Sequence, residues 1–182
     1  SLYLCNRYIE MFMVMKKVVQ LRKWSSSDID SLKKLCNGVD RTYLSDRLPQ
    51  PYTDADATWW LKMVEENEGK NGTFRAILVD GQIVGSISVE RKADVYHFDA
   101  ELGYLLMTDY LNRGIMTEAV RLICPVAFKD LGLNRITANV YDANLASKRV
   151  LQKNGFLHEG TLRRAVIKNE IVYNLDVYGL LK

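Results

Sequence analysis

Short runs of apolar residues alternate along the chain with longer segments in which apolar residues recur every three or four positions. The short runs predict strands near 17–23, 74–79, 82–89, 97–107 and 134–141, and a final hairpin near 160–182. The longer segments predict helices near 25–35 and 53–67, a helix that opens at 117–119, and a helix near 144–154. The predicted order is one strand, two helices, three strands, helix, strand, helix and two strands.

Local signals support these boundaries. Ser25 to Asp28 supply an N-cap and a first-turn acid, and Thr53 to Asp56 resemble a capping box. Asp80-Gly81 between two apolar runs predicts a tight hairpin. The antiparallel strands come first, and a later strand–helix–strand crossover must join two parallel strands. The fold class is therefore mixed α/β (α+β), with helices on both faces of the sheet and no G-x-G-x-x-G dinucleotide motif.

Composition narrows the class of protein. The chain has 182 residues, 48% of them hydrophobic, which predicts one domain, 16–182, with a sizeable core. The net charge of +3 is too small to argue for nucleic acid as a partner. Three scattered cysteines and two histidines argue against disulfides and a metal site, and favour a cytoplasmic location.

The N-terminal segment is apolar and aromatic. Residues 1–15 are interpreted as an upstream extension or an expression remnant, because Glu10 interrupts the apolar run and no small-residue cleavage site follows. No apolar run is long enough for a membrane span, so no membrane partner is expected.

One stretch is typical of an anion site. The apolar run 102–107 leads through a polar turn and Gly114 into a helix that opens with Thr117 and Glu118. Backbone N–H groups converge where a strand leads through a glycine turn into a helix, and this arrangement suits a phosphate or pyrophosphate. The alternative is an ordinary turn glycine.

Three further side chains are candidates for chemistry. Asn144 and Ser147 stand three residues apart at a helix start, so they share one face and are either caps alone or functional groups. Glu101 lies in an apolar strand, where we expect it to face a cleft or a partner and its burial to make it a better base. The alternative is a structural glutamate paired with a Lys or Arg.

Several motifs in this order resemble one family. They are Asp80-Gly81-Gln82-Ile83-Val84-Gly85, Glu101-Leu102-Gly103-Tyr104, Gly114-Ile115-Met116-Thr117-Glu118-Ala119, Asn144-x-x-Ser147 and Asn154-Gly155-Phe156. Upstream, Leu48-Pro49-Gln50-Pro51-Tyr52-Thr53 before a Trp-containing helix belongs to the same pattern. Together they resemble the GNAT acetyltransferases, and more narrowly the RimJ/RimL-type N-acetyltransferases, over about 18–181.

The resemblance implies a mostly antiparallel sheet of about seven strands, with a V-shaped splay between its two central parallel strands. It implies acetyl-CoA as co-substrate, with the pyrophosphate on backbone amides of Arg113, Gly114, Ile115, Met116 and Thr117. The pantetheine would pair with the strand end Leu105, Leu106 and Met107, and Asn144 would hydrogen-bond the cofactor. Leu111 and Met116 depart from the family's [Q/R]-x-x-G-x-[G/A] pattern, in which only Gly114 matches.

The resemblance also implies roles in catalysis. Glu101, or a water that it orients, would take the amine proton, and Ser147 would donate to the departing thiolate. Tyr141 is an alternative acid, Tyr104 is expected to pack, and Cys124 lacks a His companion and is expected in the core.

The acceptor stays open at this point. The resemblance implies the N-terminal amine of a protein, with ribosomal proteins as typical acceptors. The alternatives are a small amine (a polyamine or an aminoglycoside), for which Asp40, Asp46, Asp54 and Asp56 would line a cleft, and a CoA-binding module without activity. We expect the acceptor cleft between the 40–52 loop and the 160–182 hairpin, with Arg47, Pro51-Tyr52 and Arg163-Arg164 as contacts. Apolar residues in 1–15 and 171–181 leave a homodimer open.

Overall fold

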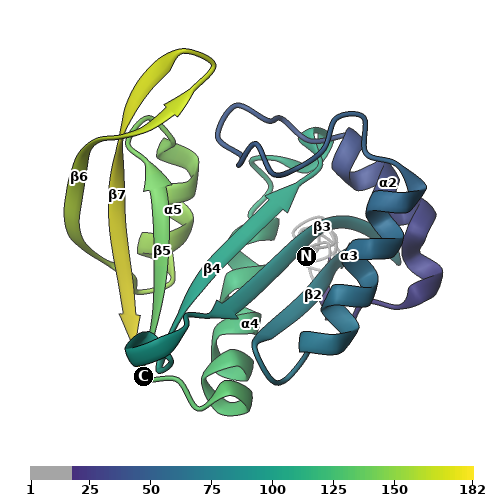
Figure 1. The fold of residues 1–182 in the computed structure, drawn as a ribbon, viewed down its shortest axis with the longest axis horizontal. Helices are drawn as coiled ribbons and strands as arrows, with labels where there is room; N and C mark the ends of the chain where they lie inside the picture. Colours follow the sequence, from purple (N-terminus) through teal and green to yellow (C-terminus); the bar gives the residue numbers. More distant parts are fainter. Residues whose placement is uncertain (1–17) are drawn as a thin grey trace, which may run out of the picture.

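The computed structural model describes residues 18–182, which form a seven-stranded sheet in the order β1-β2-β3-β4-β5-β7-β6 (Figure 1). The strands are β1 (Val19–Arg22), β2 (Gly72–Val79), β3 (Gln82–Arg91), β4 (Asp99–Leu106), β5 (Arg135–Tyr141), β6 (Leu157–Lys168) and β7 (Ile171–Leu181). All neighbouring strands are antiparallel except β4 and β5. The predicted mixed fold and the order of its strands and long helices are confirmed.

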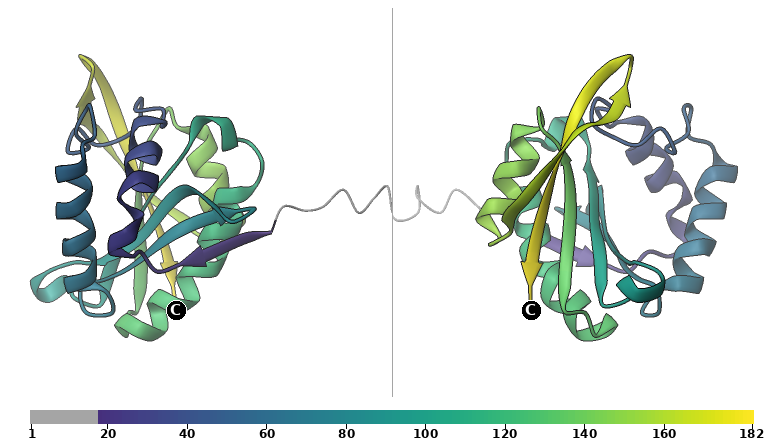
Figure 2. Two further views of the ribbon diagram at one scale, coloured as in Figure 1. Left: turned by 90° about the vertical axis from the view of Figure 1, so that its right-hand side faces the viewer. Right: turned by 60° about the vertical axis from the view of Figure 1, so that its left-hand side comes forward.

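Helices cover both faces of the sheet (Figures 1 and 2). Helices α2 (Ile29–Asn37) and α3 (Asp54–Asn67) pack on one face, and α4 (Ile115–Leu131) and α5 (Leu145–Lys153) lie on the other. Short 3₁₀ turns, η1 (Ser26–Asp28), η2 (Asp94–Tyr96) and η3 (Thr108–Tyr110), connect the elements.

The local signals act as their chemistry predicts. Thr53 and Asp56 form a reciprocal capping box at the start of α3, and Ser25 with Asp28 form one before α2. Asp80 and Gly81 have φ of 52° and 75°, the two positive values that a tight hairpin needs to match the twist of its strands.

Each face of the sheet has its own hydrophobic core. The larger core packs α4 and α5 against the sheet and includes Ala100, Leu102 and Leu106 of β4. The smaller core packs α2 and α3 on the opposite face, where Leu105 and Met107 contact it. Because side chains alternate along β4, this strand presents residues to both cores.

The parallel pair separates part-way along its length. β4 and β5 are paired only from Asp99 and Arg135 to Glu101 and Thr137, although both strands continue for several residues beyond. β4 stays paired with β3 as far as Leu106, and β5 with β7 as far as Tyr141. The two halves of the sheet therefore diverge in a V, as Figure 1 shows, and the predicted splay is confirmed.

Two expectations reach beyond the described residues. The segment 1–15 lies outside them, so its interpretation and the domain boundary at residue 16 stay predictions. Within residues 18–182 no helix is long and apolar enough to cross a membrane.

Candidate active site

The N-terminus of α4 presents backbone N–H groups that no carbonyl of the described residues accepts. Gly114 is the N-cap with φ of 74°, and a Cβ built there would meet nothing within 4 Å. The first helical hydrogen bond runs from Glu118 N–H to the Gly114 carbonyl at 3.2 Å. The N–H groups of Ile115, Met116 and Thr117 precede it and have no helical acceptor, so they are available to an anion.

The two departures from the family pattern leave these donors intact. The Met116 side chain is 7% exposed and belongs to the larger core, and the Leu111 side chain lies at the surface. Arg113 places its guanidinium carbon 5.3 Å from the centre of the Tyr110 ring. Neither departure removes a backbone N–H, so the residues present fit a pyrophosphate.

The strand edge beside the V is also available. Leu105 and Leu106 lie on the part of β4 that no longer pairs with β5, and Met107 follows directly. At Leu105 and Leu106, the edge of β4 that faces β5 has therefore lost its strand partner, whereas Met107 forms an isolated antiparallel bridge with Val39. An extended amide-containing chain can pair with such an edge.

Helix α5 brings a second polar group to the V. Asn144 is its N-cap, and its side-chain oxygen accepts from Ser147 N–H at 3.2 Å. The hydroxyls of Ser147 and Tyr104 lie 2.6 Å apart, which joins α5 to the separated part of β4. Asn154, at the other end of α5, donates to the Thr117 carbonyl at 3.1 Å and so ties α5 to the first turn of α4.

Sequence reasoning missed Tyr104. The sequence predicts only packing for it, and it does contact the larger core, but its hydroxyl also hydrogen-bonds the candidate Ser147. Burial raises the pKa of Tyr104 to about 12, and the hydrogen bond between Tyr104 and Ser147 opposes this shift. The signal available in the sequence was a tyrosine placed among leucines in the predicted strand 97–107.

Glu101 lies where β4 and β5 part. Its carboxylate accepts from Asn139 Nδ2 of β5 at 3.1 Å. The expected burial is wrong, because Glu101 is exposed on the sheet face opposite to Ala100 and Leu102. Among the described residues its hydrogen-bond partner is this amide and not a Lys or Arg.

The candidate groups thus lie on opposite faces of one opening. Glu101 belongs to the face that carries α2 and α3, whereas Tyr104 and Ser147 belong to the face that carries α4 and α5. In a continuous sheet the backbone would separate these groups. Here β4 and β5 are not paired beyond Glu101 and Thr137, so no strand pairing separates the two faces at that point.

The structure shows packing contacts for two further candidates. Cys124 is buried in the larger core, and burial raises the pKa of its thiol to about 12. Tyr141 packs its ring against Tyr43 and Tyr173, with centroids 5.8 and 5.4 Å away. In residues 18–182 no group of three or more His, Cys, Asp or Glu side chains could hold a metal ion.

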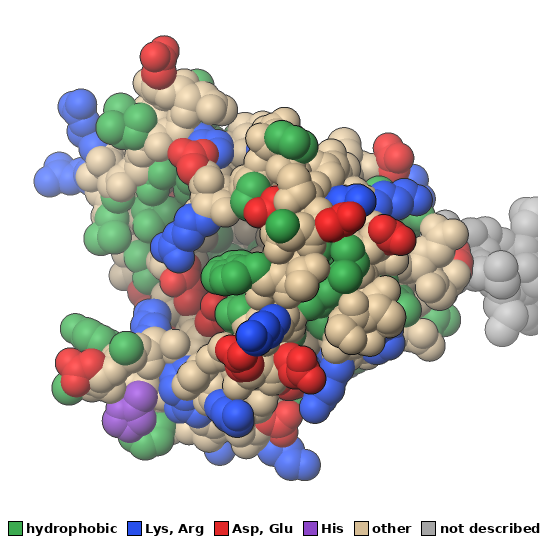
Figure 3. Space-filling view, turned by 45° about the vertical axis from the view of Figure 1, so that its right-hand side comes forward, with side chains coloured by type: hydrophobic (Ala, Val, Ile, Leu, Met, Phe, Trp, Pro, Cys, Tyr) green, Lys and Arg blue, Asp and Glu red, His purple; other side chains and the backbone are tan. Residues whose placement is uncertain are grey.

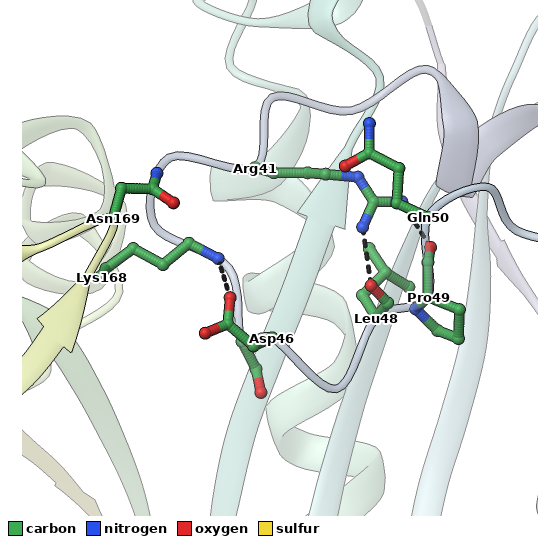
Figure 4. A pocket seen from close by; sticks show the side chains of 8 residues that line it. Arg41, Asp46, Leu48, Pro49, Gln50, Lys168 and Asn169 are labelled. Atoms are coloured by element: carbon green, nitrogen blue, oxygen red, sulfur yellow. Dashed lines mark hydrogen bonds and ion pairs between the residues drawn. The ribbon is translucent and has the colours of Figure 1, made fainter.

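A polar pocket lies between the two segments that the sequence predicted (Figure 4). It encloses about 370 Å³ and is lined by Arg41, Ser45, Asp46, Leu48, Pro49, Gln50, Lys168 and Asn169. Lys168 and Asp46 form an ion pair that joins the 40–52 loop to the hairpin. Figures 1 and 2 show the hairpin tip and this loop side by side.

The individual residues predicted to contact the acceptor do not line this pocket. Tyr52 is buried, and its backbone N–H donates to Asn37. Arg163 and Arg164 are exposed on β6, where pairing with β7 is interrupted between Leu162 and Val166. On the face drawn in Figure 3, basic and acidic side chains are interspersed.

Comparisons with known proteins agree with this geometry. Over residues 19–157 the chain matches the model of the acetyltransferase (GNAT) domain. It is 37% identical over 120 residues to the probable N-acetyltransferase YjcK of Bacillus subtilis, covering 66% of this chain and 65% of YjcK. It is 35% identical over 112 residues to the putative ribosomal N-acetyltransferase YdaF of the same organism, covering 62% of this chain and 61% of YdaF.

The match thus spans slightly less than two thirds of the length of these two relatives. Among solved structures, RimL, a ribosomal α-N-protein acetyltransferase in complex with coenzyme A, superposes with a TM-score of 0.78 at 17% identity, over 90% of this chain and 93% of RimL. A structure of this fold thus binds coenzyme A. The family model covers most of the chain, and the chain belongs to the GNAT acetyltransferase family.

Proposed function

We propose that the protein is an acetyl-CoA-dependent N-acetyltransferase that acts on the N-terminal amine of a protein. The observation that carries the proposal is the gap between β4 and β5, with Glu101 on one face and Ser147 on the other. Transfer of an acetyl group from a thioester to an amine needs a base on the amine side and a donor on the thiolate side. Glu101 would be the base on one face, and Ser147 would be the donor on the other.

Acetyl-CoA would enter from the face of α4 and α5. The N–H groups of Ile115, Met116 and Thr117, with those of Arg113 and Gly114 in the preceding turn, would hold its pyrophosphate. The unpaired edge of Leu105 and Leu106 would pair with the pantetheine amides as far as Met107, where Val39 bridges the strand. Asn144 would hydrogen-bond the cofactor while it caps α5. The thioester brought by this substrate supplies the activated acetyl group.

The amine would enter from the opposite face. Glu101 would take its proton through a water molecule, because an exposed carboxylate held by Asn139 has room for one. Ser147 would donate a hydrogen bond to the leaving sulfur. Holding both substrates at one gap would account for much of the rate.

The pocket favours a peptide over a small polyamine. Of the four aspartates that a small-amine site would use, only Asp46 lines the pocket, and Lys168 is paired with it. Asp40 bonds Thr42, Asp56 caps α3, and Asp54 pairs with Lys33. The amides of Gln50 and Asn169 are groups that hydrogen-bond a peptide backbone. The relative YdaF, by its name a putative ribosomal N-acetyltransferase, supports the same acceptor class.

A panel assay tests the acceptor class. Thiol release from acetyl-CoA is measured with peptides that begin with Ala, Ser, Thr or Met, and with free polyamines and aminoglycosides. Turnover on peptides alone is expected. Turnover on small amines alone would contradict the acceptor class, and binding of acetyl-CoA without release on any amine would favour the non-catalytic module.

A further inference from the structure

We infer that Tyr104 is a positioning residue that directs the hydroxyl proton of Ser147 toward the leaving sulfur. The inference rests on the proposed function and adds a residue to it. Its basis is the contact between two hydroxyl groups that come from opposite arms of the V.

The contact is short and bridges the opening. Tyr104 lies on β4 beyond Glu101, the last β4 residue paired with β5, and Ser147 lies in the first turn of the helix that follows β5. Their oxygens are 2.6 Å apart, a distance typical of a strong O–H···O hydrogen bond. The Tyr104 side chain is partly buried and packs against the larger core, and its hydroxyl is held by Ser147.

Ser147 is fixed in two ways. Its backbone N–H donates to the Asn144 side chain, which sets the start of the helix. A serine hydroxyl in a helix commonly bonds the carbonyl four residues earlier. In the described part of the chain, the Ser147 hydroxyl instead bonds Tyr104.

The direction of the hydrogen bond follows from acidity. Two hydroxyls in contact share one proton, and the second proton points elsewhere. A phenol is a stronger acid than an alkyl alcohol, so Tyr104 donates and Ser147 accepts. The proton of Ser147 is then free to point toward the sulfur that leaves the thioester.

Acetyl transfer from the thioester to the amine does not require the proton of Tyr104. The amine nitrogen forms the new C–N bond, the C–S bond breaks, and its electron pair goes to sulfur. The nitrogen loses one proton to Glu101 or its water, and the thiolate later takes one proton from solvent. Tyr104 keeps its proton, because its pKa of about 12 lies well above that of a thiol, about 8.5.

The test compares the variants Tyr104→Phe, Ser147→Ala and the double variant. Tyr104→Phe keeps the ring and removes the hydroxyl, so we expect kcat to fall roughly tenfold with unchanged KM values for acetyl-CoA and peptide. The double variant should be no slower than Ser147→Ala alone, because Tyr104 acts through Ser147. Tyr178→Phe removes a phenol hydroxyl from the same core and should leave kcat unchanged.

Three results would overturn the inference. The first is a Tyr104→Phe variant that keeps its kcat. The second is a variant with a raised KM or a thermal unfolding midpoint well below that of Tyr178→Phe, which would mean a structural clamp. The third is a double variant in which the two losses multiply. A wild-type protein that releases no thiol with any amine would refute the proposed function, and this inference with it.

Discussion

At the scale of residues, the point where β4 and β5 separate concentrates the candidate chemistry. Glu101 accepts from Asn139 across the last shared part of the two strands, and directly opposite Glu101 on β3 stands Glu90. Glu90 is a second exposed carboxylate, and its oxygen accepts from Ser88. The two glutamates allow a matched comparison of position at constant chemistry.

Substitution Glu101→Gln tests the proposed base. It removes the proton acceptor and keeps the shape and a carbonyl oxygen for Asn139, so we expect kcat to fall about 100-fold. Glu90→Gln removes the same charge one strand away and should change kcat less than about threefold. An equal loss of kcat in both variants would contradict the role of Glu101 as the base. It would mean that the negative charge of the two carboxylates is what affects the rate. Steady-state kinetics with a saturating peptide decide between them.

At the scale of elements, the site depends on the starts of two helices. Gly114 begins α4 and Asn144 begins α5, and the Asn154 hydrogen bond to Thr117 holds the helices together. Gly132 ends α4 with φ of 61° and Thr53 begins α3 with a capping box. Away from the V, Gly132 repeats the positive φ of Gly114, and Thr53 repeats the N-cap role of Asn144.

Substitution Gly114→Ala tests the anion site at α4. An alanine at φ of 74° is strained by about 1–2 kcal/mol, and relief of that strain would turn the N–H groups of the turn away from a bound pyrophosphate. We expect the dissociation constant for acetyl-CoA to rise roughly tenfold, measured by calorimetry. Gly132→Ala carries similar strain at the far end of the helix and should lower the unfolding midpoint without changing this affinity. Equal affinity in both variants would contradict the placement of the pyrophosphate.

Substitution Asn144→Ala separates capping from binding at α5. Loss of an N-cap costs about 1 kcal/mol in the free energy of unfolding, and Thr53→Ala should cost a similar amount at α3. Only Asn144→Ala should also weaken acetyl-CoA binding. If both variants bind acetyl-CoA like the wild type, Asn144 is a cap alone. Thermal unfolding and calorimetry on the two variants give the answer.

At the scale of the whole molecule, the last two strands are tied to α5 by a buried charge. Asp176 of β7 pairs with Lys148 of α5 and accepts from Thr161 of β6. Burial acts to raise the pKa of Asp176, but the hydrogen bonds from Lys148 and Thr161 outweigh it and hold this pKa below its ordinary value of 3.8. The charge of Asp176 therefore favours the folded state.

The lowered pKa of Asp176 makes the stability of the fold depend on pH. Because the folded-state pKa is the lower one, the stabilisation is complete above about pH 4 and is lost as the pH falls through the folded-state pKa. Asp176→Asn should cost about 2 kcal/mol at neutral pH and flatten the loss of stability in acid. Denaturant unfolding from pH 7 to pH 3 measures both effects. An unchanged acid slope in the variant would assign acid sensitivity to other carboxylates.

The sequence predicted the fold well because its signals are local. Caps at Thr53 and Ser25, the Asp80-Gly81 turn and apolar periodicity each depend on neighbouring residues. The site was predicted less completely, because Tyr104 and Ser147 are 43 residues apart and meet only in the folded chain. The exposure of Glu101 likewise depends on which face of β4 each core covers, a property that an apolar run does not reveal.

One measurement tests the central claim most directly. Acetyl-CoA is mixed with two peptides of one sequence that contains a lysine, one with a free N-terminal amine and one with that amine formylated. Thiol release is followed and the acetylated atom is located by mass spectrometry. The account predicts release and N-terminal acetylation with the free peptide and no release with the blocked one. Acetylation of the lysine side chain in both peptides would contradict it.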